Sequence, residues 1–271
     1  MRRYLAAAIL CAVLIAPASI AFGACSPASA QYVTLPGFPP GVFNNKAALD
    51  PAPGGGGSIA HVQDRNAVLP GGGGTSISTT LNGTTAGNFI LIMAAWCNSS
   101  GCGGSGTISS ITTSFSETCT EATSQPNNLN LGSTTDIWFC PNIHGGNDTI
   151  TVNFAQTSFY GGISVSEFSG VATTTPEDTT AANKNNTVTN PSTWSIATSA
   201  AISQSNELVA SVVWCVNGCG TAIAGQTGLS TPNVNMGPEY QIGASGTITN
   251  SWSNSTTFQT VFASLAAFKH R

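Results

Sequence analysis

The sequence is poor in charge, because only 7% of its 271 residues are Asp, Glu, Lys or Arg. If an N-terminal leader ending at residue 30 is removed, five basic residues remain against 11 acidic ones, which gives a net charge of −6. A chain with so few positive charges cannot form the basic patch that holds phosphate groups. The composition therefore argues against nucleic acid and anionic membranes as partners. What fills the polar positions instead is mainly Ser, Thr and Asn, beside 30 Gly residues.

Common catalytic motifs are also missing. The sequence contains no H-E-x-x-H, no G-x-S-x-G and no Walker loop, and His61 and His144 are far apart. Residues 101–106 fit the pattern G-x-G-x-x-G, but residues 107–111 after them predict a strand. A dinucleotide-binding loop needs a helix there, whose N-terminus binds the pyrophosphate. We therefore reject a dinucleotide site and predict no cofactor and no metal.

The N-terminus has the features of a signal peptide. Arg2 and Arg3 precede an apolar stretch of 13 residues from Tyr4 to Ala16, and residues 28–30 read Ala-Ser-Ala. The stretch is shorter than the roughly 20 residues needed to span a bilayer. We expect cleavage after Ala30 and a secreted protein, periplasmic or extracellular, with no membrane insertion. The alternative is a lipoprotein site at Cys25, although the usual aliphatic residue three positions earlier is absent.

Residues 31–57 predict a linker or disordered arm. They contain five prolines and the run Gly54-Gly55-Gly56-Gly57, with no periodicity that would bury one face. As a coil, the arm would reach roughly 30 Å. The remaining residues, 58–271, are enough for one domain with a single core.

The domain has no helical period, and short runs of β-branched and aromatic residues alternate with Gly, Asn and Pro clusters. This spacing predicts an all-β fold, a sandwich or barrel. In residues 148–154 the alternation is clean, with Ile150, Val152 and Phe154 on one face. The expected strands are 58–63, 75–81, 88–96, 107–113, 116–122, 134–140, 148–154, 160–168, 193–198, 206–215, 245–252 and 257–268.

An internal repeat divides the domain into two halves. Residues 88–97, which end in Trp96-Cys97, align without a gap on residues 206–215, which end in Trp214-Cys215. Farther on, 149–154 matches 247–252 and 163–168 matches 263–268. Two related β halves around one core suggest a two-sheet antiparallel sandwich of jelly-roll type.

Several short motifs support a resemblance to known proteins. They are Ala86-Gly87-Asn88-Phe89-Ile90, Asp136-Ile137-Trp138, residues 146–152, Glu167-Phe168-Ser169-Gly170-Val171, Asn206-Glu207-Leu208-Val209 and the segment from Phe262 to Phe268. With these motifs the chain resembles a family of secreted bacterial β-sandwich domains of unknown function over residues 58–268. The resemblance implies a fold and no catalytic residues. Cys97, Cys102, Cys215 and Cys219 depart from the usual pattern of that family.

Six cysteines follow the leader, an even number that indicates disulfides in an oxidising compartment. If strands 116–122 and 134–140 form a hairpin, Cys119 and Cys140 lie opposite each other, close enough to bond. We then expect Cys97 to pair with Cys102 and Cys215 with Cys219, each closing a tip loop. Two alternatives stay open, a disulfide between the two loops and a zinc site made by these four residues, although none has the C-x₂-C spacing.

The predicted ligand-binding residues are Trp96, Trp214, Asn98, Asn217 and Glu167. An exposed tryptophan could stack on the apolar face of a sugar ring, whereas a buried one would cover the neighbouring disulfide. Strand alternation places Trp96 with Ile90 and Ile92, and Trp214 with Leu208 and Val212, which favours the core. The tip loops beside them are then the better place to look for a ligand.

Glu167 falls on an apolar face with Ile163 and Val165, where a carboxylate needs a partner. We expect it to accept backbone N–H groups at the strand end. The alternatives are a calcium ligand or a catalytic acid, and a hydrolase would pair it with Asp136 or Glu117 at a fixed separation.

The sequence thus favours a secreted, non-enzymatic binding or surface-adhesion module, with an extracellular glycan or cell-surface material as the partner and homo-oligomers as an option. One alternative is a structural subunit of an extracellular assembly, because strand 88–96 is apolar on both faces. The other is a glycoside hydrolase-like enzyme.

Overall fold

The computed structural model describes residues 58–97, 107–125, 133–185, 193–216, 221–222, 226–231, 235–253 and 259–271. Within these ranges the chain forms 16 strands, and all pairs between them are antiparallel. No helix in the described ranges is long and apolar enough to cross a membrane. The all-β prediction is confirmed, and the expected leader and linker lie outside the described residues.

The first half of the domain contributes two sheets. The first inner sheet has the order β1-β8-β3-β6-β5, with β1 Ala60–Val68, β8 Tyr160–Ser169, β3 Phe89–Cys97, β6 Ser133–Cys140 and β5 Thr120–Gln125. The first outer sheet has the order β2-β7-β4, with β2 Gly74–Thr84, β7 Gly146–Ser158 and β4 Ile108–Thr112.

The second half repeats this arrangement. The second inner sheet has the order β13-β14-β11-β16-β9, with β13 Thr227–Gly228, β14 Met236–Ala244, β11 Glu207–Val216, β16 Gln259–Phe268 and β9 Glu177–Asn185. The second outer sheet has the order β10-β15-β12, with β10 Thr193–Ala197, β15 Thr249–Ser253 and β12 Thr221–Ala222.

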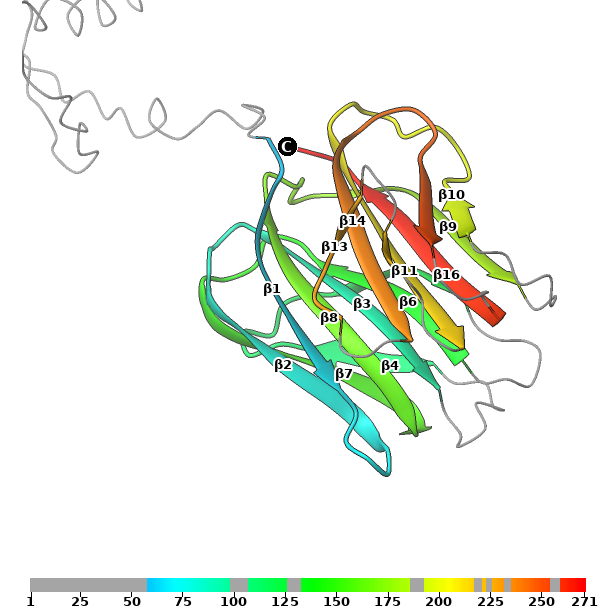
Figure 1. Cartoon of the computed structure of the whole chain (residues 1–271). Coiled ribbons are helices and arrows are strands. Elements are labelled where there is room, and N and C mark those ends of the chain that lie inside the picture. The colour runs from blue at the N-terminus through cyan, green and yellow to red at the C-terminus, as the bar shows by residue number, and fades with distance from the viewer. Residues whose placement is uncertain are drawn as a thin grey trace, which may run out of the picture. The chain divides into compact units, whose positions relative to one another are not determined.

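The four sheets are stacked in layers, held together by three apolar clusters (Figure 1). One cluster lies between the two inner sheets and includes Phe89, Phe168 and Phe268. The other two lie between each inner sheet and its outer sheet. The predicted two halves are therefore correct, but the sheets number four and not two. The jelly-roll topology stays a prediction.

The layering explains the sequence patterns of the strands. The inner strand β3 is buried at all nine positions, because it packs against the second inner sheet on one face and the first outer sheet on the other. In the outer strand β7, buried Asp148, Ile150 and Val152 alternate with partly or fully exposed residues, as expected for a sheet with one face exposed to solvent.

In the central strands β3 and β11, the sequence repeat and the structural repeat differ by one residue. Trp96 pairs with Gly161 and faces the first outer sheet, whereas Trp214 pairs with Phe262 and faces the other inner sheet. A shift of one residue in a strand turns its side chains to the opposite face. The two tryptophans, aligned in sequence, therefore belong to different apolar clusters.

Each expected strand overlaps an observed one, but four observed strands were missed. The short β12 and β13 have two residues each. The edge strand β9 is rich in polar residues, so it has no apolar alternation to detect. The strand β14 contains Gly237-Pro238, which normally indicates a turn.

Candidate functional site

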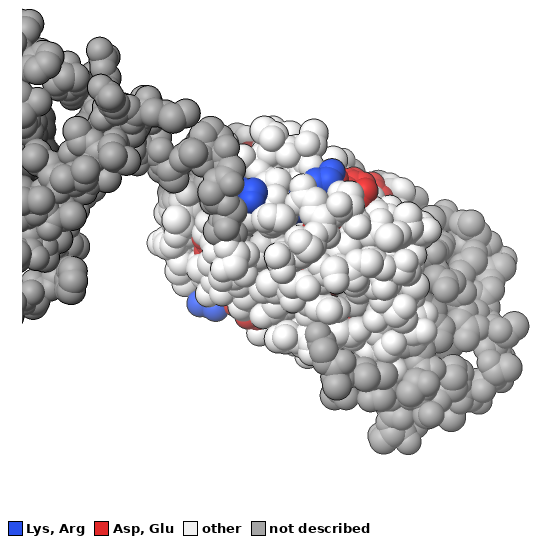
Figure 2. Space-filling model, turned by 90° about the horizontal axis from the view of Figure 1, so that it is seen from above, with Lys and Arg blue, Asp and Glu red and all other residues white. Residues whose placement is uncertain are grey.

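Five of the 11 acidic residues of this protein are buried, namely Asp136, Asp148, Glu167, Glu207 and Glu239. The outside is correspondingly poor in charge, and Figure 2 shows a face on which Lys, Arg, Asp and Glu are few among uncharged residues. Chemistry that needs titratable groups is therefore sought at the buried carboxyl groups and the side chains beside them, and recognition at uncharged surfaces.

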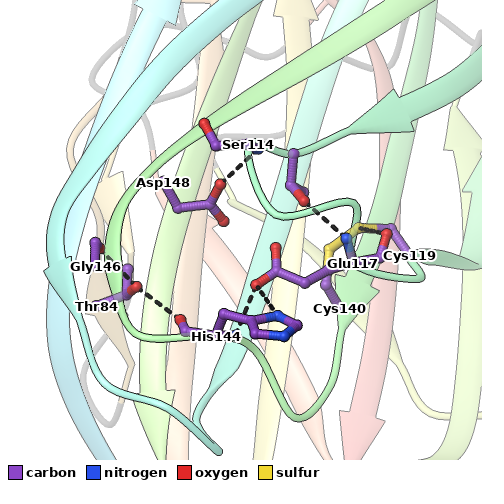
Figure 3. A network of polar contacts seen from close by, with 9 residues as sticks. Thr84, Ser114, Glu117, Cys119, Cys140, His144, Gly146 and Asp148 are labelled. Atoms are coloured by element: carbon purple, nitrogen blue, oxygen red, sulfur yellow. Dashed lines mark hydrogen bonds and ion pairs between the residues drawn. A yellow bond between two sulfur atoms is a disulfide. The ribbon is translucent and has the colours of Figure 1, made fainter.

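The most chemically distinctive cluster joins Glu117, before β5, to Asp148 on β7 (Figure 3). Asp148 Oδ1 accepts a hydrogen bond of 2.8 Å from the Ser114 backbone N–H. Burial, followed by a hydrogen bond with the Glu117 carboxyl group, raises the pKa of Asp148 to about 6. Because ionised carboxyl groups repel each other, the neighbouring Glu117 helps Asp148 to keep its proton up to about pH 6.

His144 connects this pair to the surface. Glu117 Oε1 accepts the backbone N–H of His144 at 2.8 Å and lies 3.7 Å from its ring Nδ1. The His144 side chain is 68% exposed and stacks on Phe115, with ring centroids 5.7 Å apart. Ser116, which stands between Phe115 and Glu117 in the sequence, has a φ of +57°, a conformation unusual for a residue other than Gly. The cluster thus extends from buried Asp148 to an exposed imidazole ring at the surface.

The disulfide beside this cluster has the predicted pairing. Cys119 and Cys140 are bonded with a Cα–Cα distance of 4.2 Å, next to the pair Thr120 and Phe139 of the β5–β6 hairpin. Thr113 Oγ1 accepts the backbone N–H of Glu117 two residues before the disulfide. The connection from β4 to β5 is therefore held at two places, to β7 by the carboxyl pair and to the end of β6 by the disulfide.

Both predicted tryptophans are buried, which supports the core interpretation. Trp96 is 0% exposed, packs on Phe154, and donates its Nε1–H to Asp136 Oδ2 at 2.7 Å. Burial raises the pKa of Asp136 to about 7, and the Trp96 hydrogen bond opposes this shift. Trp214 is 4% exposed. Neither ring presents a face on which a sugar could stack.

Glu167 is fully buried and hydrogen-bonded on both oxygens. Its Oε1 accepts the Thr85 backbone N–H at 2.8 Å and Asn88 Nδ2 at 2.7 Å. Its Oε2 accepts Gln63 Nε2 at 2.7 Å. The expected backbone N–H donor is present, and two amide side chains join it, so this carboxylate holds β1, β3 and β8 together.

The remaining predicted residues lie at the tip loops. Asn98, Asn217, Cys102 and Cys219 fall outside the described residues. Cys97 and Cys215 are both disulfide-bonded, so neither is the thiolate that a zinc site would need. Among the described residues, no group of three His, Cys, Asp or Glu side chains could hold a metal ion.

The Asp148 carboxyl was missed at the sequence level, although a signal for it exists. Asp148 lies two residues before Ile150 in the series that continues with Val152 and Phe154, so strict alternation places its side chain on the same buried face. Its partner Glu117 lies in the connection that follows β4, and the pairing of β4 with β7 brings that connection to Asp148. Sequence spacing alone could not show that contact.

The first outer sheet carries a second feature, which we call the hydroxyl face. It consists of the residues that alternate with the buried ones, namely Ser76, Ser78, Thr80, Ser110, Thr112, Thr149, Thr151 and Asn153. All eight are uncharged and polar. Ser78 Oγ lies 2.8 Å from Thr151 Oγ1, and Thr80 Oγ1 lies 2.9 Å from Thr149 Oγ1. These cross-strand hydrogen bonds hold the hydroxyl groups in a regular array.

Comparison with protein-family models and with curated proteins found no match for this chain. The family resemblance suggested by the short motifs stays a prediction. The finding that stands is an all-β protein with several antiparallel sheets.

Proposed function

We propose that this protein is a secreted, non-enzymatic binding module that attaches to neutral extracellular polysaccharide through the hydroxyl face. The observation that carries the proposal is the composition of that face, which presents eight hydroxyl or amide side chains and no charge. Hydroxyl groups both donate and accept hydrogen bonds, as the hydroxyl groups of a polysaccharide do.

The geometry of the face suits an extended, flat ligand. Side chains on one face of a strand repeat about every 7 Å, and neighbouring strands lie about 4.8 Å apart. Ser76, Asn153 and Ser110 form one row across the three strands, and Ser78, Thr151 and Thr112 form the next. An ionic ligand would find no counter-charge on these rows, so we favour a neutral polymer.

The two alternative functions have less support. A hydrolase would need substrate to reach Glu167 together with Asp136 or Glu117. Glu167 and Asp136 are buried and hydrogen-bonded, and the Glu117 side chain is only 3% exposed. A cleft of about 260 Å³ is lined by Ser58, Ile59, Asn206, Ile242, Gly243 and His270, none of them a carboxylate. A structural subunit was suggested by the apolar faces of strand 88–96, and layers of the same chain cover both.

The proposal is tested by co-sedimentation of the exported protein with insoluble cellulose, chitin and other neutral polysaccharides. The matched variants are Thr151→Lys and Thr249→Lys, which place a charge on the central strands β7 and β15 of the two outer sheets. We expect Thr151→Lys to lower the bound fraction at least several-fold and Thr249→Lys to leave it unchanged. The absence of sedimentation with every neutral polymer, or equal effects of the two variants, would refute the assignment.

A further inference from the structure

Three reactive side chains meet at one end of the second inner sheet, where β11, β16 and β9 are neighbours. Glu207 is the first residue of β11, Lys269 follows β16, and Asp178 is the second residue of β9. By strand alternation, Glu207 shares a face with Val209 and Val213. Lys269 likewise shares a face with Leu265 and Ala267, so the group borders the cluster under the second outer sheet.

The amine and one carboxyl group are in position to react. Lys269 Nζ lies 3.7 Å from Asp178 Oδ1, and the two side chains are 28% and 9% exposed. The Lys269 amine also donates a hydrogen bond of 2.9 Å to the Glu177 backbone oxygen. The second carboxylate oxygen, Asp178 Oδ2, accepts the Ser203 backbone N–H at 2.6 Å. This last donor is placed to stabilise negative charge that would develop on that oxygen.

Glu207 supplies a proton beside them. Its Oε1 accepts the Gln204 backbone N–H at 2.9 Å. Burial raises the pKa of Glu207 to about 7, and a hydrogen bond with Asp178 contributes to the shift. Burial acts in the same direction on Asp178, but hydrogen bonds from Ser203 and the charge of Lys269 outweigh it and lower its pKa. The shared proton therefore resides on Glu207, as a general acid requires.

We propose that Lys269 and Asp178 condense into an intramolecular isopeptide bond, with Glu207 carrying the protons. An ordinary ion pair between a lysine and an aspartate needs no second carboxyl group. A protonated carboxyl group beside the pair is what an acyl-transfer reaction requires. Fixed proximity replaces the activation that such a condensation needs in solution. The proposal concerns covalent structure and does not depend on polysaccharide binding.

The reaction balances without any co-reactant. Lys269 passes one proton to the Asp178 carboxylate, and its free amine attacks Asp178 Cγ to form the C–N bond. Glu207 protonates the oxyanion and takes a proton from the nitrogen. It then protonates one hydroxyl on Cγ, the C–O bond breaks, and water leaves. The proton of the remaining hydroxyl returns to Glu207, so an ammonium and a carboxylate become an amide and one water.

The bond would tie the edge strand β9 to the C-terminal strand β16. These strands already pair along their length, from Val261 with Asn185 to Phe268 with Glu177. A covalent link at the open end of that pairing would prevent the edge strand from peeling away. Resistance of this kind suits a module that holds material outside the cell.

The test is the intact mass of the reduced, denatured, exported protein. We expect the wild type to be lighter than its calculated mass by one water, about 18 Da. Lys269→Arg and Glu207→Gln should show no deficit, while the control Lys184→Arg, on the same strand as Asp178, should keep it. A wild type at its calculated mass, or a deficit that persists in Lys269→Arg, would overturn the proposal.

A peptide map decides the matter even if a variant fails to fold. Trypsin cannot cleave after an acylated lysine, so wild-type protein should yield a branched peptide that joins residues 66–184 to residues 185–271. Complete cleavage after Lys269 and separate peptides would show an ordinary ion pair and refute the bond.

Discussion

The buried pair of Trp96 and Asp136 shows how burial sets the chemistry of a single side chain. Asp136 Oδ2 accepts the Trp96 Nε1–H at 2.7 Å, and burial raises the pKa of this carboxyl group to about 7. The group is therefore neutral in mild acid and charged above neutrality. A charged acceptor in the core depends more strongly on its donor than a neutral one does.

Replacing Trp96 with Phe should consequently cost more stability at pH 8 than at pH 5. The lost volume affects both pH values alike, whereas the lost donor adds about 2 kcal/mol when Asp136 is ionised. Urea unfolding of Trp96→Phe and wild type at both pH values measures the difference. In an Asp136→Asn background the extra cost at pH 8 should vanish, and its persistence there would contradict the explanation.

Site residues could be predicted from sequence only where local pattern determines the environment. The pairing of Cys119 with Cys140 followed from the hairpin, and the backbone donor to Glu167 followed from its apolar neighbours. The raised pKa of Asp148 could not be predicted, because it depends on a contact with Glu117, which is distant in the sequence. The same holds for the group around Lys269.

At the scale of elements, the β5–β6 hairpin is a unit held by a covalent link. β5 is the edge strand of the first inner sheet, and the disulfide joins cysteines 21 residues apart. Closing a loop of that length lowers the entropy of the unfolded chain by an amount worth about 3 kcal/mol.

The double variant Cys119→Ser/Cys140→Ser should therefore unfold at a lower urea concentration, with about 3 kcal/mol less stability than wild type. Equilibrium unfolding monitored by tryptophan fluorescence gives the value. A loss below about 0.5 kcal/mol would mean that the hairpin holds its place without the bond.

Element prediction from the sequence worked where a strand has a buried face. β3 and β11 are continuous apolar runs, and each was found within one residue at both ends. β7 alternates and was also found, but it continues to Ser158, beyond the expected end at Phe154. β9 has no apolar pattern and β14 contains a Gly-Pro pair, so neither was found. The neighbours that share a strand face with each tryptophan were predicted correctly. The sheet against which each tryptophan packs could not be predicted, because the gapless sequence alignment does not reveal the one-residue offset between the two halves.

At the scale of the whole molecule, four stacked layers leave little surface for charge and much interior for acids. Asp136, Asp148, Glu207 and Glu239 are buried, and for Glu239 burial raises the pKa to about 8. The formal charge of −4 therefore overstates the negative charge of the folded protein at pH 5 to 6, where these four groups hold protons in whole or in part.

The stability of the fold should for this reason fall as pH rises from 5 to 8. The pKa values of Asp136, Asp148, Glu207 and Glu239 rise from 3.8 or 4.5 to about 7, 6, 7 and 8. Over that range the folded state binds more protons than the unfolded state, so the free energy of unfolding decreases with pH. The lowered pKa of Asp178 acts in the opposite direction, but only below about pH 4.

Thermal unfolding at pH 5, 6, 7 and 8 and constant ionic strength measures this dependence. Glu239→Gln cannot ionise, so its melting temperature should fall less steeply than that of wild type between pH 6 and 8, where Glu239 itself titrates. A wild-type melting temperature that stays level or rises over this range would mean that the four carboxyl groups are ionised in the folded protein. The core would then have to stabilise four buried negative charges, although burial removes the water that normally solvates them.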